Sequence, residues 1–320
     1  MLGLESWLNK QWYSHSKPNL LLRVIERLYA FLLKWQSPFN TQKLSVPVIV
    51  VGNFTVGGTG KTPLIIALVN ALKSLGFRPG VVSRGYGRKS RHAQSVIAST
   101  SIDASGDEPF LIAKRTGVLV RVDAKRFCAA TFLVEQGCDI IISDDGMQHR
   151  ALPRQIEIEV FDSMRLYGNG HLLPAGPLRE AVRGVDLRVG NGLLEDTTEA
   201  FAMQLQLVQC YHLLSGERKA LRDFTGETVH AIAGIGHPQR FFDALKALGI
   251  VVISHPFPDH HTFNSADLPV SGPILMTEKD AVKFSTSNRQ DVWVVPVDAI
   301  LSHGFFIELN RFIAQVQKSL

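Results

Sequence analysis

Residues 46–76 restrict the possible folds of this chain more than any other segment. The apolar, β-branched run VPVIVV is followed by the loop GNFTVGGTG and then by KTPLIIALVNALKSLG, whose apolar residues recur with helical spacing. A strand joined to a helix by a short glycine-rich loop is the unit from which parallel sheets with helices on both faces are built. The segment therefore predicts an α/β protein.

The rest of the chain repeats this alternation. Apolar, β-rich runs separated by segments with helical spacing follow at 80–85, 117–123, 139–145 and 156–162. They predict a P-loop NTPase-type, mostly parallel sheet covered by helices on both faces. The charged segment GERKALRDFTGE is interpreted as a linker, and the strand-like runs beyond it predict a smaller α/β domain. We therefore divide the chain into an N-terminal amphipathic helix region (1–40), a P-loop domain (41–220) and a smaller C-terminal domain (221–320).

The glycine-rich loop has the properties of a nucleotide site. Its glycines let backbone N–H groups converge on phosphate oxygens, Lys61 would reach the β- and γ-phosphates, and the Thr62 hydroxyl would bind Mg²⁺. Thr55 stands where the usual P-loop pattern has its first glycine, so an inert glycine-rich turn is the alternative. The predicted nucleotide-binding residues are Thr55, Val56, Gly57, Gly58, Thr59, Gly60, Lys61 and Thr62.

An acidic pair supports a nucleotide site. The buried-strand pattern DIIISDDG ends in Asp144 and Asp145, where a parallel sheet delivers a carboxylate to the Mg²⁺ of a P-loop. The alternative is that the two aspartates only cap the next turn.

Composition limits the partners without choosing one. The formal net charge is +5, which favours an anionic partner such as a nucleic acid, a phosphorylated substrate or an acidic membrane surface. The three cysteines have no metal-ligand spacing and are expected to be reduced and buried. The N-terminal sequence lacks the pattern of a signal peptide, so we expect the protein not to be exported.

Residues 20–35, LLLRVIERLYAFLLKW, form the most hydrophobic long segment. Its four charged residues interrupt it too often for a transmembrane span. On a helical wheel these charges and Ala30 share about a quarter of the circumference, and apolar residues fill the remainder. This apolar arc is wider than docking on one domain requires. The helix is therefore either enclosed between the core and a partner chain or embedded in the plane of a membrane surface.

Seven motifs in this order resemble the tetraacyldisaccharide 4'-kinase family, the lipid A kinases of Gram-negative bacteria. They are VGNFTVGGTGKTP, SRGYGR, GDEP, DDGMQHR, LLPAGPLRE, FPDHHTF and TEKDAVK. The resemblance extends from the N-terminal helix to about residue 283. It implies transfer of the γ-phosphoryl group of ATP to the 4'-hydroxyl of a tetraacylated, 1-phosphorylated glucosamine disaccharide, with ATP and Mg²⁺ as cofactors.

The resemblance also implies partners. The expected substrate is a glycolipid, and the N-terminal helix is expected to contact the cytoplasmic face of the inner membrane. This favours the membrane interpretation of residues 20–35. No nucleic-acid partner is expected, and a monomer is expected.

The resemblance assigns roles to individual residues. Lys61 and Thr62 hold the triphosphate and Mg²⁺, and Glu108 and Asp145 lie near the metal. Asp107 is the expected base for the sugar hydroxyl, beside His260 of the second domain. The residues expected to line the same cleft are Gln148, His149, Arg179 and Glu180.

Several of these residues have structural alternatives. Asp107 could only cap a helix that begins near Glu108, and His149 could be a satisfied loop histidine. His260 and the adjacent His261 cannot both be assigned, and we favour His260. Zinc binding by His255, His260 and His261 is not expected, because no cysteine or further ligand spacing supports it.

Three arginines follow or end predicted strands. Arg84, Arg88 and Arg121 could grip the 1-phosphate of the substrate or could form a solvated basic rim. Two other classes of protein remain as alternatives. A membrane-associated ATPase switch of the MinD and ParA type would have a signature lysine where this chain has Val56. A GTPase or metal-insertion chaperone would need a guanine motif, but TEKD places Lys279 one position too late.

Overall fold

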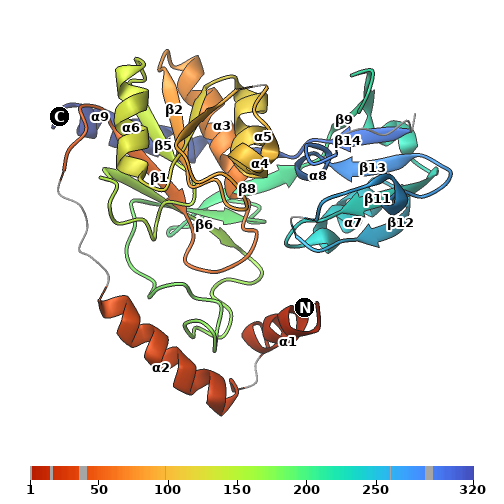
Figure 1. Ribbon diagram of the computed structural model, residues 1–320, viewed down its shortest axis with the longest axis horizontal. Helices are drawn as coiled ribbons and strands as arrows, with labels where there is room; N and C mark the ends of the chain where they lie inside the picture. The colour runs from red at the N-terminus through yellow and green to blue at the C-terminus, as the bar shows by residue number, and fades with distance from the viewer. Residues whose placement is uncertain (1, 15–16, 36–41, 98, 260, 285–290) are drawn as a thin grey trace.

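The computed structural model describes the whole chain except residues 1, 15–16, 36–41, 98, 260 and 285–290. It contains a nine-stranded sheet and a six-stranded sheet that lie side by side, with two N-terminal helices below the larger sheet (Figure 1). The predicted α/β architecture is confirmed.

The larger sheet has the strand order β15-β8-β7-β6-β1-β5-β2-β4-β3. All neighbours are parallel except at the two edges, where β3 and β15 run antiparallel to the strands beside them. Its strands are β1 (Val48–Gly52), β2 (Pro79–Ser83), β3 (Gln94–Val96), β4 (Leu119–Val122), β5 (Ile140–Ser143), β6 (Ile156–Asp162), β7 (Leu187–Asn191), β8 (Phe201–Gln206) and β15 (Asp298–Leu301).

Helices cover both faces of this sheet, and β1 shows how the sequence determines this. Alternate residues of a strand point to opposite faces. Ile49 and Val51 pack in one core with α3 (Lys61–Ser74), α5 (Asp107–Thr116) and α9 (His303–Gln317). Val48 and Val50 pack in a second core with α6 (Arg126–Glu135). A short helix, α4 (Ile102–Ser105), precedes α5.

The smaller sheet has the order β10-β9-β14-β13-β11-β12. Its strands are β9 (Gln209–His212), β10 (Arg218–Ala220), β11 (Thr228–Ala233), β12 (Val251–Pro256), β13 (Ile274–Thr277) and β14 (Val292–Val295). Its helices are α7 (Pro238–Ala247) and α8 (Glu278–Ala281), with 3₁₀ turns at Leu221–Phe224 and Ser265–Asp267.

The expected division at residue 221 does not coincide with the division between the sheets. Residues 216–227 are not a linker, because they include β10 and a 3₁₀ turn with the buried Leu221 and Phe224. At the other end, β15 pairs with β8, and α9 packs on the larger sheet through Phe305 and its neighbours. Local patterns identify elements, but they do not tell which sheet an edge strand joins.

The N-terminal helices are α1 (Leu2–Trp12) and α2 (Leu20–Lys34). None of the residues of α2 is buried. The helix contacts the loop at 171–180 through its polar side, where the Tyr29 hydroxyl donates to the Arg179 carbonyl (2.8 Å) and Glu26 accepts from the Leu172 N–H (2.9 Å). Its opposite side presents exposed apolar side chains, including Leu28 and Phe31. Among the described residues, no helix combines the length and apolar character that crossing a membrane requires.

Candidate active site

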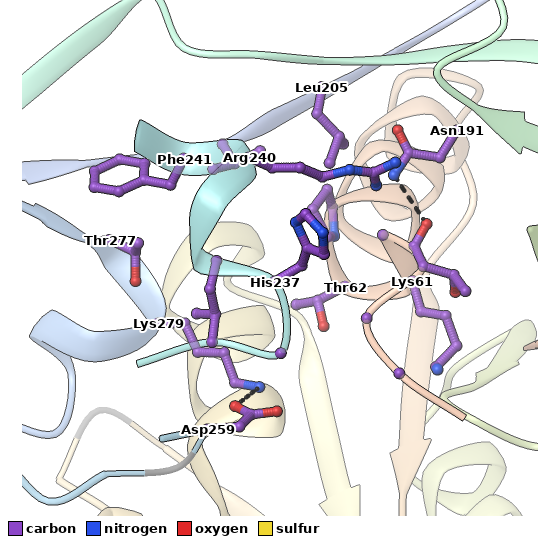
Figure 2. Close-up of a pocket in the computed structure, with 18 of the residues that line it drawn as sticks. Lys61, Thr62, Asn191, Leu205, His237, Arg240, Phe241, Asp259, Thr277 and Lys279 are labelled. Atoms are coloured by element: carbon purple, nitrogen blue, oxygen red, sulfur yellow. Dashed lines mark hydrogen bonds and ion pairs between the residues drawn. The ribbon is translucent and has the colours of Figure 1, made fainter. Parts of the chain in front are cut away.

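A cleft of about 1030 Å³ lies between the two sheets. The loop after β1 and the start of α3 line one side of it, and the loops after β11, β12 and β13 line the other. Figure 2 shows Lys61 and Thr62 on the first side, with Asp259 and Lys279 across from them. The carboxyl ends of parallel strands converge here, as expected for a ligand site in an α/β protein.

The loop before α3 has the backbone of a phosphate-binding loop. Gly60, directly before the helix, has φ +97°, and a Cβ there would lie 2.9 Å from the Asn191 amide nitrogen. In the described chain, positive φ angles outside glycine occur only at Asp145 and Leu166. Thr55 therefore needs no glycine backbone, and it forms a bridge with Leu178 instead. This backbone explains why a threonine can stand where the usual P-loop pattern has its first glycine.

Lys61 lies at the centre of a charged network. Its ammonium donates to Asn53 Oδ1 (2.9 Å) and lies 3.3 Å from Asp145 Oδ1. Arg179 contacts both oxygens of Asp145, at 3.1 and 3.0 Å. Burial alone would raise the pKa of Asp145, but Lys61 and Arg179 outweigh it and hold that pKa well below its usual range. The Asp145 carboxylate therefore stays ionised at the edge of the cleft.

Asp144 has the opposite environment, although it is adjacent in sequence. Its carboxyl group is buried and accepts from the Ser83 hydroxyl (2.9 Å), while Oδ1 has no hydrogen-bond partner among the described residues. Burial, followed by the nearby charges of Glu108 and Asp145, raises the pKa of Asp144 to about 7. The two aspartates are thus distinguished by their surroundings.

Asp107 and Glu108 begin α5 at the same edge of the sheet. Asp107 is buried, and its Oδ1 accepts from the Glu108 N–H (3.1 Å). Lys279, from α8 of the smaller sheet, lies 3.1 Å from Glu108 and 3.4 Å from Asp259 Oδ1. It lies 4.0 Å from Asp107 Oδ2. Although burial opposes it, these carboxylates raise the pKa of Lys279, so the side chain is a stable cation.

Gln148 connects two other predicted residues, Arg179 and Glu180, to Asn53. Its amide nitrogen donates to Glu180 Oε1 (2.9 Å) and to the Asn53 carbonyl (3.1 Å), and its oxygen accepts from Arg179 (3.3 Å). The structure therefore brings Gln148, Arg179 and Glu180 together beside Asp145, but of these three only Arg179 lines the cleft as predicted.

His149 lies beside this group in a cationic environment. Burial, with Arg126, Arg154 and Arg84, lowers the pKa of His149 to about 4. Its Nε2 is buried without a hydrogen-bond partner among the described residues. The ring is therefore neutral near pH 7.

The three arginines proposed for the 1-phosphate do not line the cleft. Arg84 is exposed, and Arg88 donates to the His92 carbonyl (2.7 Å). The guanidinium of Arg121 lies 3.8 Å from the centre of the Phe132 ring and donates to the Ser95 hydroxyl (2.9 Å). Arg121 instead joins β3 and β4 to α6, because its side chain leaves the sheet toward that helix.

The prediction for His260 lies outside the described residues. Its neighbour His261 contacts Asp267 (3.1 Å) and packs against Phe257 and Phe263. The His261 ring is therefore held in place by contacts with these three residues.

Sequence reasoning gave no role to several residues in or beside the cleft. Asn53 and Asn191 fix the phosphate-binding loop, the latter through its bond to the Thr59 carbonyl (3.0 Å). Asp259 and Lys279 lie in the motifs FPDHHTF and TEKDAVK, and these motifs are the sequence feature that could have indicated a role for them in the site. Arg240 of α7 pairs with Asp162 at the end of β6 (2.8 Å), a contact between segments that no local pattern connects.

The comparison with known protein families agrees with this geometry. The family described as tetraacyldisaccharide-1-P 4'-kinase matches residues 18–314. The chain belongs to this family. This kinase is 46% identical to the tetraacyldisaccharide 4'-kinase of Methylobacillus flagellatus over 97% of its own length and 94% of the relative. It is also 46% identical to that of Stenotrophomonas maltophilia, over 97% of each chain.

A solved structure also resembles this kinase. A crystal structure of LpxK from Aquifex aeolicus in complex with ATP matches it with a TM-score of 0.74 and 29% identity. The match covers 91% of this chain and 98% of that one. The predicted fold, family and kinase activity are confirmed.

Proposed function

We propose that this kinase transfers the γ-phosphoryl group of ATP to the 4'-hydroxyl of a tetraacylated glucosamine disaccharide 1-phosphate, giving the lipid A precursor that carries both phosphates. Family membership supports the reaction. The observation that carries the site assignment is the convergence, in one cleft, of Lys61, the carboxylates of Glu108 and Asp145, and Lys279 from the other sheet, with Asp107 buried 4.0 Å from Lys279.

Phosphoryl transfer depends mainly on positioning and on stabilising charge. Lys61 is already at the phosphate-binding loop, and its contacts with Asn53 and Asp145 hold its ammonium group in the cleft. When the Lys61 ammonium moves from Asp145 to the transferring phosphoryl group, Arg179 remains paired with the Asp145 carboxylate and compensates its charge. The network thus supplies a cation to the reaction without leaving an unpaired carboxylate behind.

The residues present fit a magnesium ion. The described residues contain no group of three or more His, Cys, Asp or Glu side chains that could hold a metal. Mg²⁺ is usually bound by one or two carboxylates together with phosphate oxygens and water. Thr62, Asp145 and Glu108 offer hydroxyl and carboxylate oxygens at the loop and would hold it. When bound, the ion would neutralise charge on the phosphate oxygens.

Asp107 is the proposed base. Phosphorus gains the sugar oxygen and loses the bond to the leaving ADP, while the sugar proton passes to the Asp107 carboxylate. Asp107 is buried at the start of α5, which limits exchange of that proton with water. His260 is proposed to assist from the second domain. Lys279, which faces both Asp107 and Glu108, keeps the smaller sheet against these carboxylates.

We propose that α2 binds the cytoplasmic surface of the inner membrane. Its polar side is used by Glu26 and Tyr29 for contacts with the protein, so the apolar side is turned outward. Exposed apolar side chains on one side of a helix, with basic residues nearby, suit an in-plane position at an anionic surface. The glycolipid would then reach the cleft from the membrane.

Labelled γ-phosphate tests the reaction. ATP carrying ³²P at the γ-position is incubated with the protein and vesicles that contain the tetraacyldisaccharide 1-phosphate. We expect label in the glycolipid, at the 4'-position. Release of label only to water would instead indicate an ATPase switch, and retention on ATP would indicate a binding module, so either result would overturn the proposal.

A further inference from the structure

The two sheets are joined by two adjacent strand connections. Only Leu207 and Val208 separate β8 of the larger sheet from β9 of the smaller sheet, and only Pro296 and Val297 separate β14 from β15. Because β8 pairs with β15 and β9 pairs with β14, the four strands form one two-stranded antiparallel ribbon that crosses from sheet to sheet. The pairing between the two strands of this ribbon is interrupted only at its crossing point, where the ribbon passes from one sheet to the other.

Arg115 spans this crossing point. It lies in the last turn of α5, on the larger sheet, and its guanidinium donates to Glu278 Oε2 of α8 (2.7 Å). The same guanidinium contacts Asp298, the first residue of β15. Glu278 belongs to the smaller sheet and its side chain is only 6% exposed. The planar guanidinium of Arg115 therefore links α5 to one carboxylate of the smaller sheet and to one carboxylate of the larger sheet.

The other end of α5 carries the carboxylates of the active site. Glu108 is the second residue of the helix and contacts Lys279, which directly follows Glu278 in α8. Arg115 lies seven positions after Glu108, or about 10 Å along the helix. The adjacent residues Glu278 and Lys279 thus contact opposite ends of α5. One contact lies beside the crossing ribbon and the other lies in the cleft.

We infer that Arg115 is a positioning residue for phosphoryl transfer: through Glu278 and Asp298 it fixes the axis about which the two sheets rotate, so that Lys279 meets the carboxylates at the start of α5 when the cleft closes. Contacts close to a hinge persist when two bodies rotate, whereas contacts farther away open. The Arg115 contacts therefore serve as a pivot and the Glu108–Lys279 contact as the part that opens. This inference rests on the proposed function.

A distance measurement tests the pivot without relying on activity. Cys128 on α6 is exposed, while Cys138 and Cys210 are buried. A spin label on Cys128 and another on the variant Lys246→Cys, at an exposed position of α7, report the separation of the two sheets. We expect Arg115→Met and Glu278→Met to broaden the distance distribution. Arg311→Met is the matched control, because its partner Glu308 lies in the same helix α9, and it should leave the distribution unchanged.

Kinetics of the same variants test the consequence. Misplacing a reacting group by about 1 Å can cost up to about 10²-fold, so we expect kcat for transfer to fall by about 10- to 100-fold. The double variant Arg115→Met/Glu278→Met should be no worse than either single variant, because the pair acts as one unit. Should Arg115→Met fail to fold, Arg115→Lys and Glu278→Gln retain most of the side-chain volume and answer the same question.

The outcomes separate this inference from the function on which it rests. Unchanged distance distributions together with wild-type kcat in the folded Arg115 variants would overturn the pivot while leaving the kinase assignment intact. A wild-type protein that transfers no label to the glycolipid would instead overturn the proposed function, whatever the distances show.

Discussion

Lys61 and Asp145 form an ion pair, with 3.3 Å between Nζ and Oδ1, although they follow different strands of the larger sheet. β1 and β5 are neighbours, and this register places the residues that follow them side by side. The pair defines the part of the cleft at which phosphoryl chemistry is expected.

Replacing Lys61 should remove most of the activity. Lys61→Ala is expected to lower kcat/KM for ATP by at least about 10²-fold, the usual loss for one strong electrostatic stabiliser. Asn70→Ala, at an exposed position of the same helix, is the control and should retain activity. Steady-state phosphate transfer measures both variants. Near-normal transfer by Lys61→Ala would contradict the assignment of the phosphate-binding loop.

Replacing Asp107 should lower the rate of the chemical step more than it lowers the affinity for ATP. Asp107→Ala and His260→Ala are each expected to lower kcat, in line with the 10²- to 10⁴-fold contribution typical of a base, with the dissociation constant for ATP nearly unchanged. The double variant should be much less than multiplicatively worse. Asp103→Asn, which changes an exposed carboxylate paired with Lys89, is the control.

The competing role for Asp107 is that of a metal ligand. Calorimetry of ATP binding at two Mg²⁺ concentrations, combined with single-turnover transfer, distinguishes the two roles. Weaker MgATP binding by Asp107→Ala, with partial recovery of activity at high Mg²⁺, would show that the residue holds the metal and is not the base.

The exposed side of α2 should determine membrane binding. Replacing Leu28, Phe31 and Leu32 with Ser is expected to release the folded protein from anionic liposomes, because each apolar side chain contributes about 1.5–3 kcal/mol when buried. The control replaces the exposed Leu214, Val270 and Ile307 with Ser. Co-sedimentation and thermal unfolding are measured together. A triple variant of α2 that unfolds while still binding liposomes would argue against the membrane role.

Acid should destabilise the protein partly through His149. Its pKa of about 4 lies below the value near 6.5 expected in the unfolded chain, so the unfolded chain binds more protons between these two values. Stability therefore falls as the pH drops from about 6.5 toward 4. We expect a contribution of about 1–2 kcal/mol, reduced by the partial exposure of the ring. Urea unfolding of His149→Gln should show a weaker dependence over this range, whereas the exposed His303→Gln should match wild type.

Much of the fold follows from local sequence patterns. Five predicted strands all lie in the larger sheet, in the runs 46–51, 80–85, 117–123, 139–145 and 156–162. An apolar, β-branched run bounded by glycines and charged residues is compatible with few buried structures other than a strand. The same logic placed the phosphate-binding loop and the acidic pair at one edge of the sheet. These features depend on residues that are close in sequence.

Tertiary structure decided what depends on distant partners. Nothing local indicates that β15 returns to the larger sheet, that Arg121 stacks on Phe132, or that Lys279 meets Glu108 across the cleft. The different environments of Asp144 and Asp145 have the same origin, because the first is enclosed by the core and the second is held by Lys61 and Arg179. Sequence thus determined the elements and the kind of chemistry, while long-range packing decided which charged groups meet, because burial and pairing depend on residues far apart in the chain.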